Sequence, residues 1–342
     1  STVRTYLKAI ATIHNPPKNL IVSTGFAVVR GKGGFDHRFL SFSLSSEPFV
    51  DQVVSNSVGV SYPAINSSAL AHLELLSPPL SEQKAIADFL DRKTGQIDKL
   101  IGIKEKQIEL LKEQRTALIN QAVTKSLNPN AKLKPSGIDW LGDIPDGWQV
   151  VPLFRKFQQR KRVNKDLEET NVLSLSYGNI VRRNVESNFG LLPESFSTYN
   201  ILSEGDIVLR LTDLQNDKRS LRVGIAKEQG VITSAYISLK PYKETNPSYY
   251  YSLLHSYDIL KVFYNLGGGL RQTLRYDELK RLVLLEPPIE EQSRIVEFVD
   301  KITTFTNKNV GRLLKEVEYL KEYRTALISE AVTGKIDVRG EA

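Results

Sequence analysis

Cysteine is absent from this 342-residue sequence, and so is methionine. Without cysteine the chain can form no disulfide and can bind no metal through thiolate ligands. This absence fits the reducing cytoplasm, which is the location that we expect. No run of about 18 apolar residues is present, so we expect no membrane partner. The four histidines are scattered and lack the spacing of a metal site.

What is present is typical of a globular protein with more than one domain. The chain is 41% hydrophobic and 25% charged, so it can bury real cores. Its length suits two domains of roughly 100–200 residues each. The formal net charge is +7. Basicity at this level favours a polyanionic partner but does not identify one.

One helical motif occurs twice. The stretch LKEQRTALINQAVT at 111–124 and the stretch LKEYRTALISEAVT at 320–333 agree at eleven of fourteen positions, with an offset of 209. The same offset matches SPPLSEQKAIADFLD at 77–91 with EPPIEEQSRIVEFVD at 286–300. An internal repeat of this length indicates a duplicated structural unit.

The two copies match less well toward their beginnings. At the same offset, GVSYPAINSSAL at 59–70 faces GGLRQTLRYDEL at 268–279, and VSTGFAVVR at 22–30 resembles ITSAYISLK at 232–240. The second copy holds roughly 90 residues between PSGIDWLGDIPDGW at 135–148 and residue 232, whereas the first holds about 20 before its equivalent. We therefore expect the first unit to lack about 70 residues at its start, by truncation or by natural shortening.

The end of each copy predicts a long helix, at about 81–125 and 290–333. Each follows a Pro-Pro pair, which limits extension of a helix toward its start. A coiled-coil spacing of three and four residues continues through both segments and predicts that they pair with each other. The fixed offset and the globular domain between the two segments predict that the pairing is antiparallel. The alternative is two ordinary amphipathic core helices. The predicted seam consists of Ile97, Ile101, Lys104, Ile108, Leu111, Arg115, Leu118 and Ala122, and of Thr306, Val310, Leu313, Val317, Leu320, Arg324, Leu327 and Ala331.

The remainder of each copy predicts short strands, because runs rich in Val, Ile, Leu, Ser and Thr alternate with Gly and Pro. NVLSLSYGNIV, GDIVLRLTDL, VGIAKEQGVITSAYISLKP and RLVLLEPP show this pattern, and NLIVSTGFAVVR at 19–30 shows it in the first copy. A helix is predicted in PSYYYSLLHSYDILKVFYNL. The fold class is therefore α+β.

Basic and amide side chains gather near predicted turns of the second copy. Arg and Lys bind phosphates, whereas Arg, Asn, Gln, Ser and Thr at loop tips can also bind base edges. This mixture suits sequence reading of DNA better than simple charge attraction, although any one cluster could be a solvated surface. The candidate DNA-binding residues are Arg160, Lys161, Arg162, Arg182, Arg210, Thr212, Gln215, Asn216, Lys218, Arg219, Arg222, Arg271, Gln272, Thr273 and Arg275, with Ser61 and Tyr62 in the first copy.

Catalytic motifs are incomplete throughout. HNPPK at 14–18 has the Asn-Pro-Pro of an adenine methyltransferase, but Lys18 stands where an aromatic ring would stack the base. GGG at 267–269 lacks the spacing of a phosphate-binding loop. ELK at 278–280 is a fragment of a nuclease metal site without an acidic partner. We therefore predict no catalytic centre and no metal site.

The repeated motifs, together with GIDWLGDIPDGWQVVPL, resemble the specificity subunit of type I restriction-modification enzymes over nearly the whole chain. The resemblance implies two target recognition domains that alternate with two long helices, which pair antiparallel as a ruler. By this resemblance, residues 1–77 are the C-terminal portion of an incomplete first recognition domain and 78–130 the central helix. Residues 131–286 are then the second recognition domain, and 287–342 the C-terminal helix.

The resemblance also implies the partners and the division of chemistry. Double-stranded DNA with a bipartite target, methyltransferase subunits and a restriction subunit would be the partners. Such a subunit has no catalysis of its own, so the cofactors S-adenosylmethionine, ATP and Mg²⁺ are expected on the partner subunits. The short first domain predicts that the second half-site is recognised better than the first. Exposed strand edges recruit other chains, which leaves a homodimer open.

Two other functions stay open at this point. A catalytic DNA methyltransferase or nuclease would need a complete motif that the sequence does not show. A coiled-coil scaffold unrelated to nucleic acid would predict no salt-sensitive DNA binding. Methyl transfer by the chain alone and binding to DNA at different salt concentrations separate these alternatives.

Overall fold

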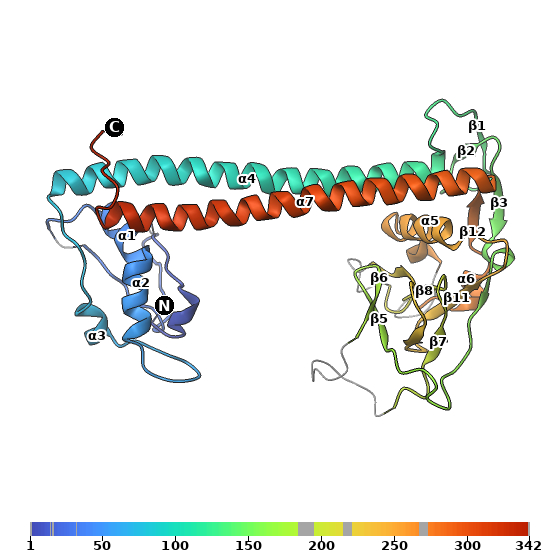
Figure 1. The fold of residues 1–342 in the computed structure, drawn as a ribbon, viewed down its shortest axis with the longest axis horizontal. Coiled ribbons are helices and arrows are strands. Elements are labelled where there is room, and N and C mark those ends of the chain that lie inside the picture. The colour runs from blue at the N-terminus through green and yellow to red at the C-terminus, as the bar shows by residue number, and fades with distance from the viewer. Residues whose placement is uncertain are drawn as a thin grey trace. The chain divides into compact units, whose positions relative to one another are not determined.

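Two helices exceed all other elements in length, and they lie where the repeat predicts them. In the computed structural model, α4 spans Leu80–Lys125 and α7 spans Ile289–Val332. The structure describes residues 2–13, 15, 17–31, 33–183, 195–214, 221–266 and 273–340. The chain divides into two compact units, Ser1–Leu110 with Asn309–Ala342, and Leu111–Lys308. Figure 1 shows the elements in order of sequence.

The predicted seam is the buried side of both helices. Each of its sixteen positions is buried or half-buried, including the polar positions Lys104, Arg115 and Arg324. In the first unit, Asp98 pairs with Arg324 at 2.9 Å and Lys104 pairs with Glu316 at 2.6 Å. In these two pairs, the residue number increases along α4 while the number of the paired residue in α7 decreases.

The duplication is also visible in how the two helices begin. Gln83 and Gln292, which are 209 residues apart, are both buried near the start of their helix. In each unit the amide nitrogen donates to the carbonyl oxygen of the first proline of the Pro-Pro pair, Pro78 at 2.8 Å and Pro287 at 2.9 Å. Equivalent hydrogen bonds therefore fix the backbone at the start of each helix.

The first unit is helical in its described part. Asp36 caps α1, since its carboxylate accepts hydrogen bonds from the backbone N–H groups of Arg38 and Phe39. Phe39 then packs into a core with apolar residues of α4 and α7 such as Leu90 and Ala331. The short elements of this unit are η1 (Thr5–Leu7), α1 (His37–Ser45), α2 (Glu47–Ser55) and α3 (Ser67–Ala71).

The strands predicted within residues 19–30 are wrong. No described residue of this segment is in a helix or strand, and Ile21 and Val28 are 89% and 62% exposed. A strand needs a neighbouring backbone to satisfy its N–H and C=O groups. Apolar composition alone predicted strands here, and the described residues of the unit supply no such neighbour.

The second unit carries all the strands of the described chain, and they pair antiparallel. A four-stranded sheet has the order β4-β11-β8-β9, and the other pairs are β1-β2, β3-β12, β5-β6 and β7-β10. The strands are β1 (Leu133–Pro135), β2 (Asp143–Pro145), β3 (Gln149–Pro152), β4 (Phe157–Gln159), β5 (Leu173–Ser176), β6 (Asn179–Arg182), β7 (Asn200–Leu202), β8 (Ile207–Leu209), β9 (Val223–Ile225), β10 (Gly230–Ile232), β11 (Ile237–Pro241) and β12 (Val283–Glu286). The strands predicted in this copy are confirmed.

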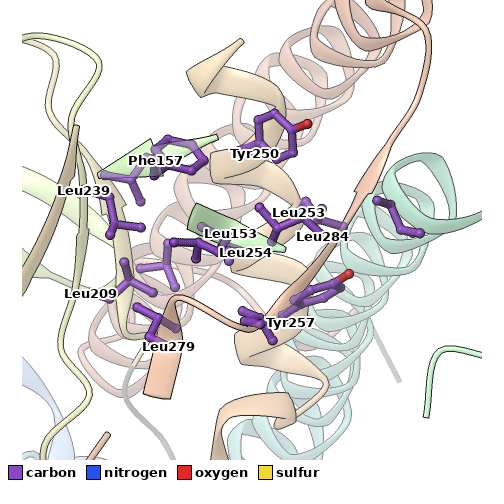
Figure 2. Close-up of a cluster of buried hydrophobic side chains, with 14 of the residues drawn as sticks. Leu153, Phe157, Leu209, Leu239, Tyr250, Leu253, Leu254, Tyr257, Leu279 and Leu284 are labelled. Atoms are coloured by element: carbon purple, nitrogen blue, oxygen red, sulfur yellow. The ribbon is translucent and has the colours of Figure 1, made fainter. Parts of the chain in front are cut away.

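Helix α5 (Pro247–Ile259) contributes several buried side chains to the main core of this unit. Asn246 caps it and Pro247 occupies its first turn, a combination that favours helix initiation. Figure 2 shows Leu253, Leu254 and Tyr257 of this helix in one buried cluster with side chains of the strands. The remaining elements are η2 (Leu153–Arg155), η3 (Val262–Asn265) and α6 (Tyr276–Leu279).

Replacing Gly230 with alanine is expected to destabilise the second unit. A Cβ there would lie 2.6 Å from the carbonyl oxygen of Asn171 and 2.7 Å from the side chain of Leu173. Overpacking of this kind costs about 1–3 kcal/mol of unfolding free energy. Urea denaturation measures the loss. Gly147→Ala is the matched control, because no atom lies within 4 Å of its added Cβ, and equal losses in both variants would contradict the prediction.

Candidate nucleic-acid interface

Four cations of the second unit lie around the short helix α6. Arg275 precedes the helix, and Lys280 and Arg281 follow it. Lys280 pairs with Asp277 at 2.7 Å, and this hydrogen bond, aided by the charges of Lys161 and Arg281, lowers the pKa of Asp277. Lys161, Arg275, Lys280 and Arg281 are called the α6 cationic cluster from here on.

Two hydrogen bonds hold α6 and the residue after it beside η2 and the edge strand β4 of the sheet. The backbone N–H of Phe154 donates to the carbonyl oxygen of Lys280 at 3.0 Å, and the hydroxyl of Tyr276 donates to that of Phe157 at 3.4 Å. Lys161, Arg275 and Arg281 are exposed, and no carboxylate of the described residues lies within 4 Å of their charged groups. Exposed cations without an acidic partner are suited to phosphate oxygens.

The sequence identified two members of this cluster and missed the other two. Lys161 and Arg275 were predicted, whereas Lys280 was treated as part of a nuclease fragment and Arg281 was not considered. The available signal was the basic dipeptide Lys280-Arg281 at the start of the predicted strand RLVLLEPP. That this dipeptide lies near Lys161 could be found only from the structure, because the two segments are distant in the sequence.

The prediction that Arg222 contacts DNA directly is wrong. Its side chain is 0% exposed, and its guanidinium donates to the carbonyl oxygens of Arg210, Thr212 and Asp213. A basic residue in a polar stretch is usually exposed, which is why the sequence was misleading. Arg210 and Thr212 themselves are half-buried beside it.

Three other predicted arginines are held by carboxylates. Arg160 makes two hydrogen bonds to the buried carboxylate of Asp206, at 2.8 and 3.0 Å, so its charge is already engaged. Arg162 pairs with Glu168 at 3.0 Å on the surface. The pair of Arg182 and Glu228 raises the pKa of the arginine and lowers that of the glutamate through their hydrogen bonds.

The other predicted residues are dispersed. Thr273 is exposed in the second unit, two residues before Arg275. Ser61 and Tyr62 are exposed in the first unit, where the guanidinium of Arg4 lies 4.8 Å from the centroid of the Tyr62 ring. The residues outside the described part of the chain are Gln215, Asn216, Lys218, Arg219, Arg271 and Gln272.

The candidate catalytic fragments have structural roles where the structure describes them. The carboxylate of Glu278 accepts the backbone N–H of Arg275 at 2.8 Å, so it caps α6. Among the described residues, no group of three His, Asp or Glu side chains could hold a metal ion. The stretches 14–18 and 267–269 lie partly or wholly outside the described residues. No described helix is long and apolar enough to cross a membrane.

A family model identifies the chain. The model of the type I restriction modification DNA specificity domain matches residues 8–113 and 145–319, which is most of the sequence. The chain belongs to this family. The two matched regions agree with the duplication in the sequence, and the mixed helix and strand structure agrees with the expected α+β class.

Known type I specificity subunits are similar to this chain. The putative MjaX specificity subunit of Methanocaldococcus jannaschii is 27% identical, over 82% of this chain and 63% of that protein. The MjaVIII specificity subunit of the same organism is 25% identical, over 94% of this chain and 75% of that protein. The EcoBI specificity subunit of Escherichia coli is 23% identical, over 90% of this chain and 67% of that protein. The chain thus spans less than two thirds of the first of these relatives.

Two solved structures share the fold of this chain. A chain from a study of complex assembly and conformational transition in a type I R-M system has a TM-score of 0.70 at 19% identity, covering 97% of this chain and 80% of that one. The HsdS subunit of Thermoanaerobacter tengcongensis has a TM-score of 0.52 at 19% identity, and the match covers 92% of this chain and 74% of that one. At this identity the likeness concerns the fold alone.

Proposed function

We propose that this chain is the sequence-specific DNA-recognition subunit of a type I restriction-modification complex. It reads a bipartite target and docks methyltransferase subunits for adenine methylation and restriction. The observation that carries this proposal is the family match to both copies of the repeat. The α6 cationic cluster supports it, because it supplies exposed cations without acidic partners to a DNA backbone.

The two long helices would form the ruler of the subunit. We infer that α4 and α7 pair as an antiparallel coiled coil, with the seam predicted from sequence between them. The pairs of Asp98 with Arg324 and Lys104 with Glu316 support this, and Arg115 donates to Asn307 at 3.1 Å in the second unit. At 1.5 Å per residue, a helix of this length measures roughly 65–70 Å.

The division of labour is the one that the resemblance to type I specificity subunits implies. Methyl transfer and cleavage, with S-adenosylmethionine, ATP and Mg²⁺, would belong to partner subunits. The incomplete motifs are consistent with this, since Glu278 is engaged as a helix cap and Lys18 cannot stack a base as an aromatic ring would. Repeated docking surfaces on a duplicated chain would suit two copies of one partner.

Methyl transfer tests this function. We expect the purified chain alone and the methyltransferase subunit alone to leave duplex DNA unmodified at the target. The mixture is expected to methylate adenine at one defined sequence. Incorporation of labelled methyl groups, followed by mapping of the modified bases, gives the readout. Methyl transfer by the chain alone would contradict the proposal and favour the catalytic alternative.

A further inference from the structure

A cavity of about 410 Å³ lies in the first unit. Its walls come from α1, α2, the end of α7 and the segment just before α4, and they include the apolar side chains of Phe49, Leu75, Leu76 and Val332. Ser43 of α1 also lines the cavity. It is 5% exposed, and its Oγ has no hydrogen-bond partner among the described residues. An unpaired buried hydroxyl is unfavourable, so an occupant that reaches it would be stabilised there.

The backbone along one wall of this cavity is unpaired. Among the residues that the structure describes, no hydrogen bond reaches the N–H or C=O of Leu75 or Leu76. The residue before them, Glu74, is held by the side chain of Gln52, which accepts from its N–H at 3.0 Å and donates to its carbonyl oxygen at 3.1 Å. Unpaired backbone groups beside an apolar cavity can take up another strand.

The repeat shows what occupies the equivalent place in the second unit. At the offset of 209, Leu75 corresponds to Leu284 of β12, and Val332 corresponds to Val123. Strand β3 lies against β12 there, and Leu284 pairs with Val151 in antiparallel register. All three second-unit side chains belong to the main core. These two walls of the cavity thus correspond to residues that share a core with β3.

A third wall of the cavity agrees with this correspondence. The offset of 210, which relates the stretches near residues 22 and 232, assigns Ser43 of α1 to Leu253 of α5. The same offset relates the residues that cap these two helices, Asp36 and Asn246. Figure 2 shows Leu253 in one buried cluster with Leu153, the residue that follows β3. The place of β3 in the second unit therefore corresponds to the cavity in the first.

We propose that this cavity is a strand-binding site, which takes up an extended segment of another polypeptide. Strand β3 begins at residue 149, so neither offset gives it a counterpart within residues 1–342. The segment would pair antiparallel with the backbone at Leu75 and place apolar side chains in the cavity, as Val151 and Leu153 do in the core of the second unit. It would share the chemistry of β3, which is extended, uncharged and rich in valine. This inference concerns the first unit alone and does not depend on DNA recognition.

A peptide with the sequence of residues 146–153, DGWQVVPL, tests this site. It carries a fluorescent label at its N-terminus and is titrated with the full chain while its anisotropy is measured. We expect saturable binding with a Kd on the order of tens of micromolar, because one short strand buries little surface. No binding at roughly 0.5 mM of the chain, which limits any affinity to the millimolar range, would overturn the proposal.

Methylation of the peptide backbone separates strand pairing from apolar contact. In the second unit the N–H of Leu153 donates to the carbonyl oxygen of Leu282 at 2.8 Å, and successive residues of a strand direct their N–H groups to opposite sides. The N–H of Val151 therefore faces the partner strand, and that of Val150 faces away. N-methylation at Val151 should weaken binding about tenfold or more, whereas N-methylation at Val150 should change it less than about twofold. Equal effects would show that the peptide does not pair in this register, and the proposal would fail.

The variant Leu75→Lys locates the binding in the first unit. A lysine in the wall of the cavity opposes the burial of an apolar strand, so peptide affinity should fall about tenfold or more. Leu20→Lys is the matched control, because Leu20 is a 46% exposed leucine of the same unit that does not line the cavity. Wild-type affinity in a folded Leu75→Lys variant overturns the proposal. If that variant does not fold, as judged by circular dichroism, the two methylated peptides decide the matter with the unaltered chain.

Sedimentation of the chain without peptide identifies a competing occupant. We expect the wild-type chain and the Leu75→Lys variant to have the same mass in solution. A wild-type dimer that Leu75→Lys dissociates would show that a second copy of the chain fills the cavity. That result would overturn the assignment of the site to a strand of another polypeptide.

Discussion

Replacing Trp148 with alanine is expected to lower the unfolding free energy of the second unit by about 3–5 kcal/mol. Trp148 is 1% exposed and belongs to the main core of that unit. Its Nε1 donates to the carboxylate of Glu291 at 3.0 Å, and the hydroxyl of Ser126 donates to the other carboxylate oxygen at 2.6 Å. The substitution thus creates a cavity and removes one of two donors from a half-buried carboxylate at the start of α7.

Urea denaturation monitored by circular dichroism measures this loss. Trp140→Ala is the matched control, since it removes the same side chain from the same motif. Trp140 is 45% exposed and contacts the Tyr257 ring edge-on, with the ring centroids 5.1 Å apart. Its replacement should cost about 1 kcal/mol. Similar losses in the two variants would show that the burial of Trp148 does not anchor the unit.

Neutralising the α6 cationic cluster is expected to weaken DNA binding roughly 100-fold at moderate salt, whatever the DNA sequence. The variant combines Lys161→Gln, Arg275→Gln and Arg281→Gln, the three members whose charges have no carboxylate within 4 Å in the described chain. The slope of log K against log salt concentration should fall by about 0.9 for each phosphate contact removed. Binding to a labelled duplex at several salt concentrations gives both quantities.

A second triple variant separates local contacts from net charge. Lys112→Gln, Lys308→Gln and Lys315→Gln remove the same charge from exposed positions of α4 and α7. Long-range attraction alone would make the two triple variants equivalent. If they weaken binding equally, the α6 cationic cluster does not contact the DNA backbone.

The helices and the strands of the second unit could be predicted because their signals are local or periodic. The Pro-Pro pairs mark the start of α4 and α7 to within one residue, and the seam from Ile97 to Ala122 is buried or half-buried at every step. The run PSYYYSLLHSYDI forms α5 as predicted. Composition and spacing are sufficient for a helix, because its backbone hydrogen bonds lie within one segment. They also located the strands of the second unit, where neighbouring strands are present to pair with them.

The candidate site was harder to predict because its residues depend on distant partners. Whether a guanidinium is exposed depends on acceptors such as the carbonyl of Thr212 and the hydroxyl of Tyr264, which the sequence does not bring together. The same is true of Arg160, whose charge is taken by Asp206. In residues 19–30, apolar character suggested strands, but strand formation needs a neighbouring strand that composition cannot reveal.

Selection from random duplexes tests the central claim most directly. The chain is combined with methyltransferase subunits, bound duplexes are recovered and sequenced, and the methyltransferase alone serves as the control. The account predicts enrichment of one bipartite sequence with a fixed spacing, which the control does not enrich. The account is contradicted if no sequence is enriched in the presence of the chain relative to the methyltransferase alone.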